Sequence, residues 1–251
     1  MIDFHTHVLP NIDDGAADVQ MATKMIEQEL SQGVEEIVFT PHYYGRKRRP
    51  EQFLEERQQV FEELKPHIPE NVKIYLGSEV HFTGINILDD EELCKLAIEG
   101  TRYILVEFPF VEKWSTSLLE RLSDFIYDTG YTPIIAHVER YQEVLKNPAI
   151  ITHLVEMGCL IQVNTRAFIN KWEKNFAFAL LKHGLVHCIG TDAHDVTDRA
   201  PDYEEAKIAV EKAGYGKAWA EIQHNMRAIL NGGTFRIPIG GKVKKFMNRY
   251  Y

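Results

Sequence analysis

Histidines and carboxylates form two short motifs with the same spacing. His5 and His7 have one residue between them, and so do Asp192 and His194. In an extended chain alternate side chains point to the same face, so each pair can bind one metal ion. Imidazole mixed with carboxylate, without thiolate, suits divalent ions such as Mn, Fe, Zn or Co. The two motifs therefore predict a metal site.

Residues of metal-ligand type follow six of the seven strands that the sequence predicts. In an α/β barrel the loops after the strands converge on one mouth, so side chains at these positions meet. A lone histidine or glutamate at a strand end is more often structural, but joint occupation of six ends is hard to produce by chance. The motifs are His5-Thr6-His7, Thr40-Pro41-His42, Gly77-Ser78-Glu79, Glu107, His137 and Thr191-Asp192-Ala193-His194.

The remaining histidines do not share this placement. They fall on predicted helices, in loops or inside a strand. We interpret them as structural or surface residues: His67, His81, His153, His183, His187 and His224.

Short β-branched and aliphatic runs alternate with segments of helical periodicity, which is typical of βα units and a parallel sheet. Strands are predicted at residues 2–4, 36–39, 73–76, 103–106, 132–136, 160–163 and 186–190. Helices are predicted at residues 18–30, 50–64, 117–127, 148–157, 173–183, 202–213 and 216–230. This alternation favours a closed or nearly closed barrel, with a doubly wound open sheet as the alternative.

No linker or internal repeat divides the chain, so a single domain over residues 1–251 is expected. Residues 231–251 remain unassigned. The N-terminus has no basic segment followed by an apolar run, so we expect neither a signal peptide nor a membrane span. The expected compartment is the cytoplasm.

Composition excludes several classes of protein. The formal net charge of −9 disfavours binding to DNA or to an anionic membrane by bulk charge. The three cysteines contain no CxxC pair, which disfavours a disulfide framework or a cysteine-rich zinc site. None of them is followed six residues later by arginine, which excludes a cysteine-dependent phosphatase.

In their order and spacing the motifs resemble the polymerase and histidinol phosphatase (PHP) superfamily. Within it they are most similar to the bacterial tyrosine-protein phosphatases of capsule and exopolysaccharide synthesis found in Gram-positive bacteria. The resemblance implies a distorted, TIM-like (β/α)7 barrel of the PHP type, with the metal site at the C-terminal ends of the strands. It runs from Met1 to about Arg199 and rests on the strand-end motifs with Asp13-Asp14-Gly15, Val106-Glu107-Phe108-Pro109 and His137-Val138-Glu139-Arg140.

The resemblance also implies three metal ions in each chain, with manganese expected first and iron, cobalt or zinc as alternatives. The ligands implied for one ion are His5, His7, Glu79 and Asp192. Those implied for the second ion are Glu79, Glu107 and His137, and those for the third are Asp14, His42 and His194. Asp13 is an alternative to Asp14, because a shift of one residue would exchange them.

Such a centre favours hydrolysis of phosphoesters, since bound ions lower the pKa of water from 15.7 to about 7 and clamp phosphate oxygens. An aryl phosphate needs less help from a general acid, because its phenolate leaving group has a pKa of about 10. Arg140 and Arg199 follow the fifth and seventh strands, and we expect both to bind the substrate phosphate. The basic run at residues 46–49 is a candidate clamp for an acidic, tyrosine-rich peptide.

We therefore expect a metal-dependent protein-tyrosine phosphatase in which hydroxide on the metal attacks phosphotyrosine directly. By resemblance, its partner is the tyrosine-rich tail of a bacterial tyrosine kinase that controls polysaccharide export. Three alternatives remain: a small-molecule phosphatase of the histidinol-phosphate type, a PHP nuclease, and a non-enzymatic metal-binding protein. The sequence is also compatible with an oligomer.

Overall fold

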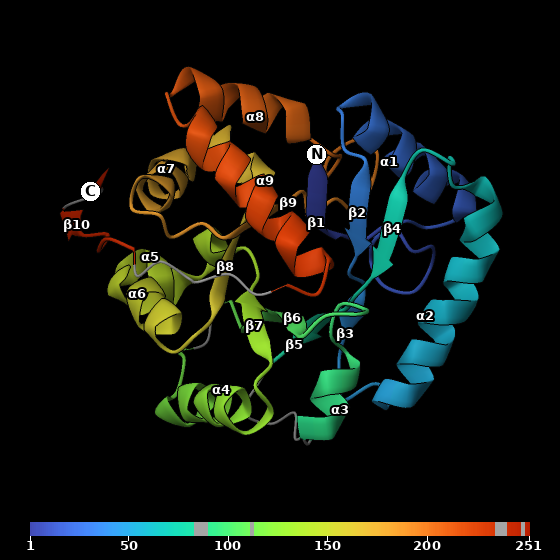
Figure 1. Ribbon diagram of the computed structural model, residues 1–251, viewed down its shortest axis with the longest axis horizontal. Helices are drawn as coiled ribbons and strands as arrows, with labels where there is room; N and C mark the ends of the chain where they lie inside the picture. The colour runs from blue at the N-terminus through green and yellow to red at the C-terminus, as the bar shows by residue number, and fades with distance from the viewer. Residues whose placement is uncertain (83–89, 111–112, 234–239, 247–248) are drawn as a thin grey trace.

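The computed structural model describes residues 1–82, 90–110, 113–233, 240–246 and 249–251. Parallel strands lie at the centre and helices surround them (Figure 1). Most residues of these strands are buried, as expected for a parallel sheet that is covered on both faces. The strands are β1 (Ile2–Thr6), β2 (Glu36–Phe39), β3 (His42–Tyr43), β4 (Lys73–Leu76), β5 (Glu79–His81), β6 (Tyr103–Glu107), β7 (Thr132–Ile135), β8 (Leu160–Asn164) and β9 (Cys188–Gly190).

The helices begin and end where capping and periodicity indicate. The Asp18 carboxylate accepts the Met21 N–H at the start of the first helix, which buries one face against the sheet. The helices are α1 (Val19–Ser31), α2 (Pro50–Leu64), α3 (Asp90–Lys95), α4 (Thr116–Thr129), α5 (Gln142–Lys146), α6 (Ala149–Glu156), α7 (Lys174–Lys182), α8 (Tyr203–Lys212) and α9 (Gly216–Leu230). The sequence did not predict α3 and α5, which are short.

Two of the predicted strands are interrupted and then continue. β2 is followed by β3, and β4 is followed by β5, in each case after a break of two residues. Pro41 lies in the first interruption, and it has no N–H to donate to a neighbouring strand. The first halves, β2 and β4, form a sheet with β1 in the order β1-β2-β4. The second halves, β3 and β5, belong to a sheet with the order β3-β5-β6-β7-β8-β9.

The first strand returns to the last. Thr6 and Ala193 form a parallel β-bridge, and the Asp192 N–H donates to the His5 carbonyl at 2.7 Å. The parallel strands thus curl around a common interior, which confirms the expected distorted barrel rather than an open sheet.

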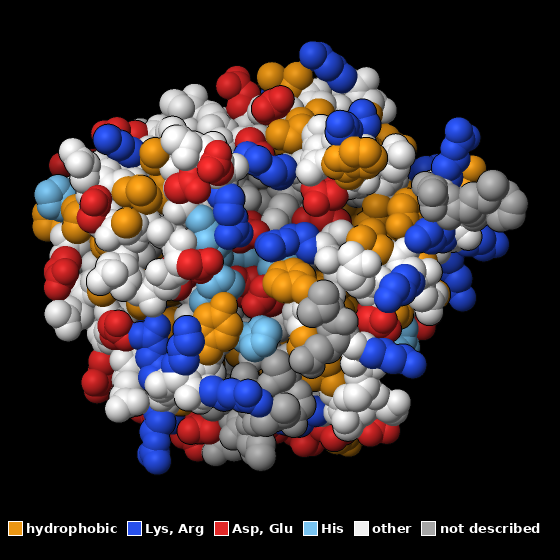
Figure 2. Space-filling view, turned by 180° about the vertical axis from the view of Figure 1, so that it is seen from behind, with side chains coloured by type: hydrophobic (Ala, Val, Ile, Leu, Met, Phe, Trp, Pro, Cys, Tyr) orange, Lys and Arg blue, Asp and Glu red, His pale blue; other side chains and the backbone are white. Residues whose placement is uncertain are grey.

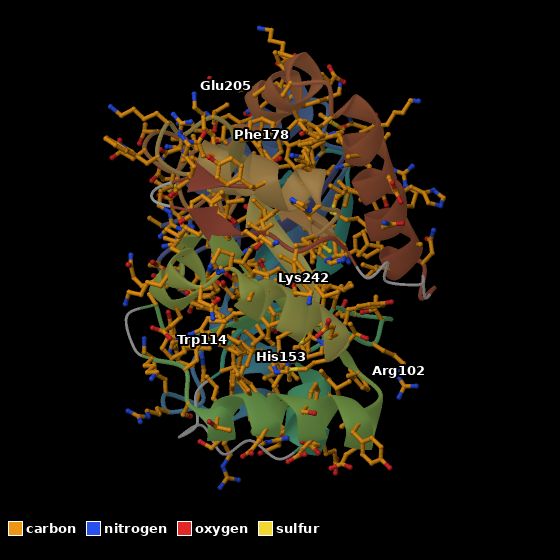
Figure 3. All side chains as sticks on the ribbon, turned by 90° about the vertical axis from the view of Figure 1, so that its left-hand side faces the viewer. Arg102, Trp114, His153, Phe178, Glu205 and Lys242 are labelled. Carbon is orange, nitrogen blue, oxygen red and sulfur yellow. The ribbon has the colours of Figure 1, made fainter. Side chains whose placement is uncertain are left out.

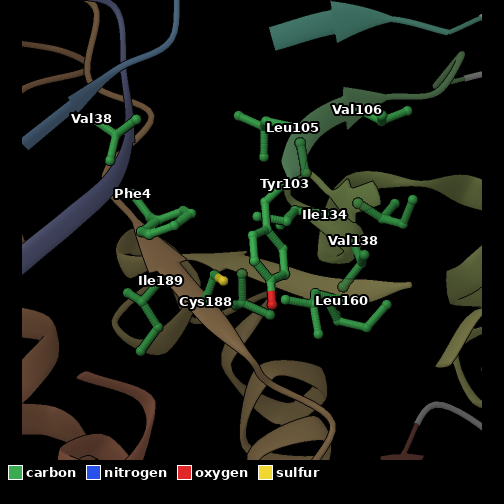
Figure 4. Packing of buried hydrophobic residues seen from close by; sticks show 14 of the residues in the cluster. Phe4, Val38, Tyr103, Leu105, Val106, Ile134, Val138, Leu160, Cys188 and Ile189 are labelled. Carbon is green, nitrogen blue, oxygen red and sulfur yellow. The ribbon is translucent and has the colours of Figure 1, made fainter. Parts of the chain in front are cut away.

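An apolar plug fills the interior below the strand ends. Figure 4 shows Phe4, Tyr103, Ile134, Leu160 and Cys188 gathered between the strands, and all five are buried. α9 lies across the amino ends of the strands in Figure 1. Its Gln223 Oε1 accepts the Ile2 N–H at 2.8 Å. The amino ends of the strands are therefore closed, and only the carboxyl ends are free to form a site.

The C-terminal segment, which the sequence left unassigned, packs on the side of the molecule. The Gly241 N–H donates to the His183 carbonyl at 2.8 Å, and the Lys245 Nζ donates to the Leu145 carbonyl at 2.7 Å. Figure 3 shows Lys242 of this segment between Phe178 of α7 and His153 of α6. The segment ends in the antiparallel pair β10 (Lys245–Phe246) and β11 (Arg249–Tyr250). No described helix combines the length and the apolar character needed to cross a membrane.

His187 makes the fold sensitive to acid. Its Nδ1 accepts the Ile161 N–H at 3.0 Å, and burial lowers its pKa to about 4. The folded state therefore binds this proton less readily than the unfolded state, where the pKa of histidine is about 6.5. The stability is full above about pH 6.5 and falls by about 3 kcal/mol as the pH falls toward 4. We expect urea unfolding of the metal-free protein to show this loss.

His187→Gln retains an acceptor for Ile161 and removes the titration, so its stability should fall less between pH 7 and pH 4. His153→Gln, on the exposed face of α6, is the matched control and should behave as the original chain. Equal losses in the original chain and in His187→Gln would contradict the assignment.

Candidate metal centre

β1 carries the first two candidate ligands into the open end of the barrel. His5 and His7 are fully buried, and their Nε2 atoms lie 3.1 Å apart. This arrangement needs glycine on both neighbouring segments. A Cβ on Gly190 would lie 2.5 Å from the His5 Cβ, and a Cβ on Gly15 would lie 2.1 Å from the His7 carbonyl oxygen. Both glycines therefore let neighbouring backbone approach the two histidines.

Glu79 lies at the centre of the cluster and is fully buried. Its Oε2 is 3.3 Å from the Nε2 atoms of His5 and His7 and 2.9 Å from His42 Nδ1. Its Oε1 is 2.8 Å from His137 Nε2. A single carboxylate thus faces four imidazoles from three strand ends.

The two neighbouring aspartates face different ways. Asp13 Oδ2 lies 2.7 Å from His7 Nδ1 and accepts the His42 N–H at 2.8 Å. Asp14 Oδ1 instead lies 3.4 Å from His42 Nε2 and 3.6 Å from His194 Nε2. Asp13 therefore orients a histidine from behind, while Asp14 faces the cluster.

Asp192 connects the histidines to two arginines. Its Oδ1 lies 3.4 Å from His7 Nε2 and accepts from Arg199 Nη2 at 3.0 Å. Its Oδ2 accepts from Arg140 Nη1 at 2.8 Å and from Asn164 Nδ2 at 2.9 Å. Both arginines that the sequence singled out thus reach the cluster. Figure 2 shows histidine and acidic side chains at the centre of this face, bordered by Lys and Arg.

Two candidate ligands have an unusual backbone. His137 has φ of 31° and Asp192 has φ of 53°, in the left-handed region that residues other than glycine rarely adopt. Each such residue costs on the order of 1 kcal/mol or more, and they concentrate at functional sites. The strain turns both side chains into the cluster directly after β7 and β9.

Burial and neighbouring charges shift the pKa values of the cluster in opposite directions. Burial raises the pKa of Glu79, but His5 and His137 outweigh it and hold that pKa well below its usual range. Burial lowers the pKa of His7, but Asp13 raises it well above the ordinary value. Without an ion these shifts favour an anionic Glu79 and a cationic His7, whereas burial lowers the pKa of His194.

Several buried atoms of the cluster make no hydrogen bond of acceptable geometry among the described residues, although some of them lie close to other polar atoms: His42 Nδ1, Glu79 Oε2, His137 Nδ1 and His194 Nε2. Buried polar atoms are nearly always satisfied, so this concentration fits a site for cations. Three groups of ligand atoms each lie within 4.8 Å of one another: His7, Asp14, His42 and His194; His5, His7 and Asp192; and His42, Glu79 and Glu107. Nitrogen and oxygen donors in this mixture suit divalent metal ions.

The sequence interpretation missed residues beside the cluster. His81, which we had interpreted as structural, has its Nδ1 3.1 Å from Glu107 Oε2. It stands two residues after Glu79, the spacing that already linked His5 to His7. Gln162 Oε1 accepts the His137 N–H at 2.5 Å and lies on β8, the one predicted strand without a ligand at its end.

The basic run at residues 46–49 does not act as a unit. Arg48 donates to the Ile12 carbonyl and pairs with Glu56, so it fastens the loop to α2. Lys47 lies over the Tyr44 ring at 4.7 Å, and both line a cavity of about 510 Å³ that Asp14 and His42 also line.

Comparisons with known proteins agree with this geometry. A family model described as capsular polysaccharide synthesis, CpsB/CapC, matches residues 1–231. The tyrosine-protein phosphatase YwqE of Bacillus subtilis is 32% identical over 251 residues, with 95% of each chain covered. The tyrosine-protein phosphatase CpsB of Streptococcus pneumoniae is 29% identical, with 92% of this chain and 98% of the relative covered.

Solved structures extend the comparison. A structure from a study of YwqE and CpsB, described there as metal-dependent tyrosine phosphatases, matches with a TM-score of 0.84 at 28% identity. It covers 98% of this chain and 100% of the other. A histidinol phosphate phosphatase from Lactococcus lactis matches with a TM-score of 0.50 at 17% identity and 92% coverage of both chains, which shows a shared fold. The resemblance inferred from the motifs is thereby confirmed.

Proposed function

The chain belongs to the CpsB/CapC family of capsular polysaccharide synthesis, and from this premise we propose that it is a metal-dependent protein-tyrosine phosphatase. The observation that carries the proposal is the meeting of buried histidines and carboxylates with two arginines at Asp192. Full-length similarity to YwqE and CpsB supports the same activity. We also propose that residues 1–251 act as one domain in the cytoplasm.

We propose three ions, of which manganese is the first candidate. His5, His7, Glu79 and Asp192 would hold one ion. Glu79, Glu107 and His137 would hold the second, and Asp14, His42 and His194 the third. Divalent ions lower the pKa of a bound water to about 7 and polarise phosphoryl oxygens when they are present.

The chain's own residues would orient the substrate. Arg140 and Arg199 both reach Asp192, so a phosphate beside that carboxylate lies within their range. Burial lowers the pKa of Arg140, but Asp192 and the other carboxylates raise it above the ordinary value, so the guanidinium stays charged. A planar guanidinium holds two phosphate oxygens at once. We assign both arginines to binding and orienting the phosphate.

The substrate we propose is phosphotyrosine in a protein, specifically the tyrosine-rich tail of a bacterial tyrosine kinase in capsule or exopolysaccharide control. The phenolate leaves readily because its pKa is about 10. The site then needs to hold the phosphate and exclude other orientations more than it needs a strong general acid.

Metal removal tests the proposal. Exhaustive chelation should lower hydrolysis of a phosphotyrosine peptide by at least about 100-fold, because bound ions would activate the attacking water and would supply positive charge that binds phosphate. Addition of Mn, Co or Fe should restore it, with metal content followed by elemental analysis. Full activity in metal-free protein would falsify the proposal.

A comparison of substrates separates this function from that of a small-molecule phosphatase. The metal-loaded protein should hydrolyse the phosphotyrosine peptide with a higher kcat/KM than an alkyl phosphate such as histidinol phosphate. The reverse ranking would favour the small-molecule activity on the same centre.

A further inference from the structure

A cavity of about 170 Å³ opens beside Asp192. Three arginines line it, and two of them are Arg140 and Arg199, which the proposed function already uses. The third is Arg166, at the start of the short helix Thr165–Phe168 that follows β8. Two guanidinium groups are enough to hold one phosphate, so the third needs a separate explanation.

Arg166 is held in place and still accessible. Its Nε donates to Asp202 Oδ2 at 3.0 Å, and its side chain is 48% exposed. Asp202 also accepts from Thr165 Oγ1 at 2.5 Å, which fixes the carboxylate. Within the described part of the chain no partner is found for the Nη groups of Arg166. A guanidinium fastened by one edge in this way can present its other edge to an anion.

Arg166 also connects two cavities. A second cavity, of about 310 Å³, is lined by Arg166, Ile169, Asn170, Asp202 and Glu205. Arg166 and Asn170 line both cavities, so a groove leads from Asp192 past Arg166 toward Glu205 on α8. An extended peptide with its phosphotyrosine at the metal centre could follow this groove.

An exposed aromatic residue follows Asn170, the residue that lines both cavities with Arg166. Trp172 is 80% exposed, and its backbone N–H donates to Asn170 Oδ1 at 2.9 Å. Lys171 Nζ lies 4.8 Å from the centre of its ring, which adds positive charge at the same place. The segment next to the groove therefore combines an exposed apolar ring with a cation, a combination that suits an acidic, aromatic peptide.

We infer that Arg166 and Trp172 form a recognition site for the peptide that flanks the phosphotyrosine, with Arg166 binding an acidic side chain. The inference rests on the proposed function, because a peptide would follow this groove only with its phosphotyrosine held at the metal centre. A charge-assisted hydrogen bond from Arg166 is worth about tenfold in affinity.

Binding of a non-hydrolysable peptide tests the inference without requiring turnover. The probe is a fluorescent peptide in which a phosphonate analogue replaces phosphotyrosine and glutamates flank it on both sides. Its twin carries glutamines instead. Fluorescence anisotropy with the Mn-loaded protein should show about tenfold tighter binding of the glutamate peptide.

In Arg166→Gln the preference for the glutamate peptide should be lost. Lys174→Gln, an exposed residue of α7, makes the same charge change and should keep the preference. A third peptide with the phosphonate analogue at the flanking positions shows whether a second phosphotyrosine can replace the carboxylate. No preference in the original protein, absence of binding, or a full preference in Arg166→Gln would each overturn the inference. Loss of turnover with the preference intact would instead count against the proposed function.

Discussion

Glu79→Gln is expected to lower kcat for phosphotyrosine peptides by on the order of 10³-fold. The change keeps the shape of the side chain and removes the charge that faces four histidines. Changes in residues that only support metal ligands cost about 10- to 100-fold in metal affinity, and a central carboxylate should cost more. The amide also lacks the negative charge with which Glu79 would hold divalent cations. Steady-state kinetics measure the change in kcat, and elemental analysis at matched protein concentration measures the change in metal content.

Glu27→Gln is the matched control, because Glu27 is exposed on α1 and far in the sequence from the cluster. It should keep both activity and metal content. Circular dichroism confirms that each variant is folded before it is assayed. If Glu79→Gln bound a full complement of metal and hydrolysed the peptide normally, Glu79 would not be the central ligand.

Arg140→Ala is expected to lower kcat by about 10²- to 10³-fold while metal content stays unchanged. Removing one fixed donor to a developing oxyanion has an effect of this size. Arg140 lies over the Phe110 ring at 4.6 Å, so its guanidinium is oriented before substrate arrives. Arg140→Lys keeps the charge but loses the planar fork, and it should recover only part of the activity.

Arg249→Ala provides the control for charge, since Arg249 is exposed on the C-terminal segment. Its activity should match that of the original chain. Equal activity of Arg140→Ala and Arg249→Ala would exclude Arg140 from phosphate binding. A parallel loss of metal in Arg140→Ala would instead make it a support for Asp192.

The local sequence pattern was sufficient to predict most of the helices and strands. α2 and α9 begin and end at the predicted residues, and so do β2 and β4. These segments have clear periodicity or compact apolar runs, and sharp boundaries such as Pro50 at the start of α2. The short second halves β3 and β5 were not predicted, because two residues carry too little periodicity to be recognised. His42 and Glu79 consequently lie in strands rather than in loops.

The candidate centre was visible in the sequence for a physical reason. Parallel strands place their carboxyl ends at one edge, so ligands that each follow an apolar run must converge whatever the detailed packing. The short segments around His5, Glu79, His137 and Asp192 are therefore enough to predict that these four side chains meet. Sequence alone also suffices to exclude cysteine-dependent phosphatase chemistry, since that requires a fixed spacing.

The orientation of the side chains at the site, and the residues that surround it, depended on tertiary contacts between segments of the chain. Asp13 and Asp14 are equivalent in the sequence, and only the packing of their loop against β1 and β3 turns one toward His7 and the other toward His194. The position of Arg166 beside Asp192 depends on the pairing of β8 with β9, and its orientation depends on Asp202. The Asp14–His194 and Arg166–Asp202 contacts join residues tens of positions apart or more, and no local periodicity encodes them. The sequence thus specified which groups gather, while the tertiary structure decided which way each one faces.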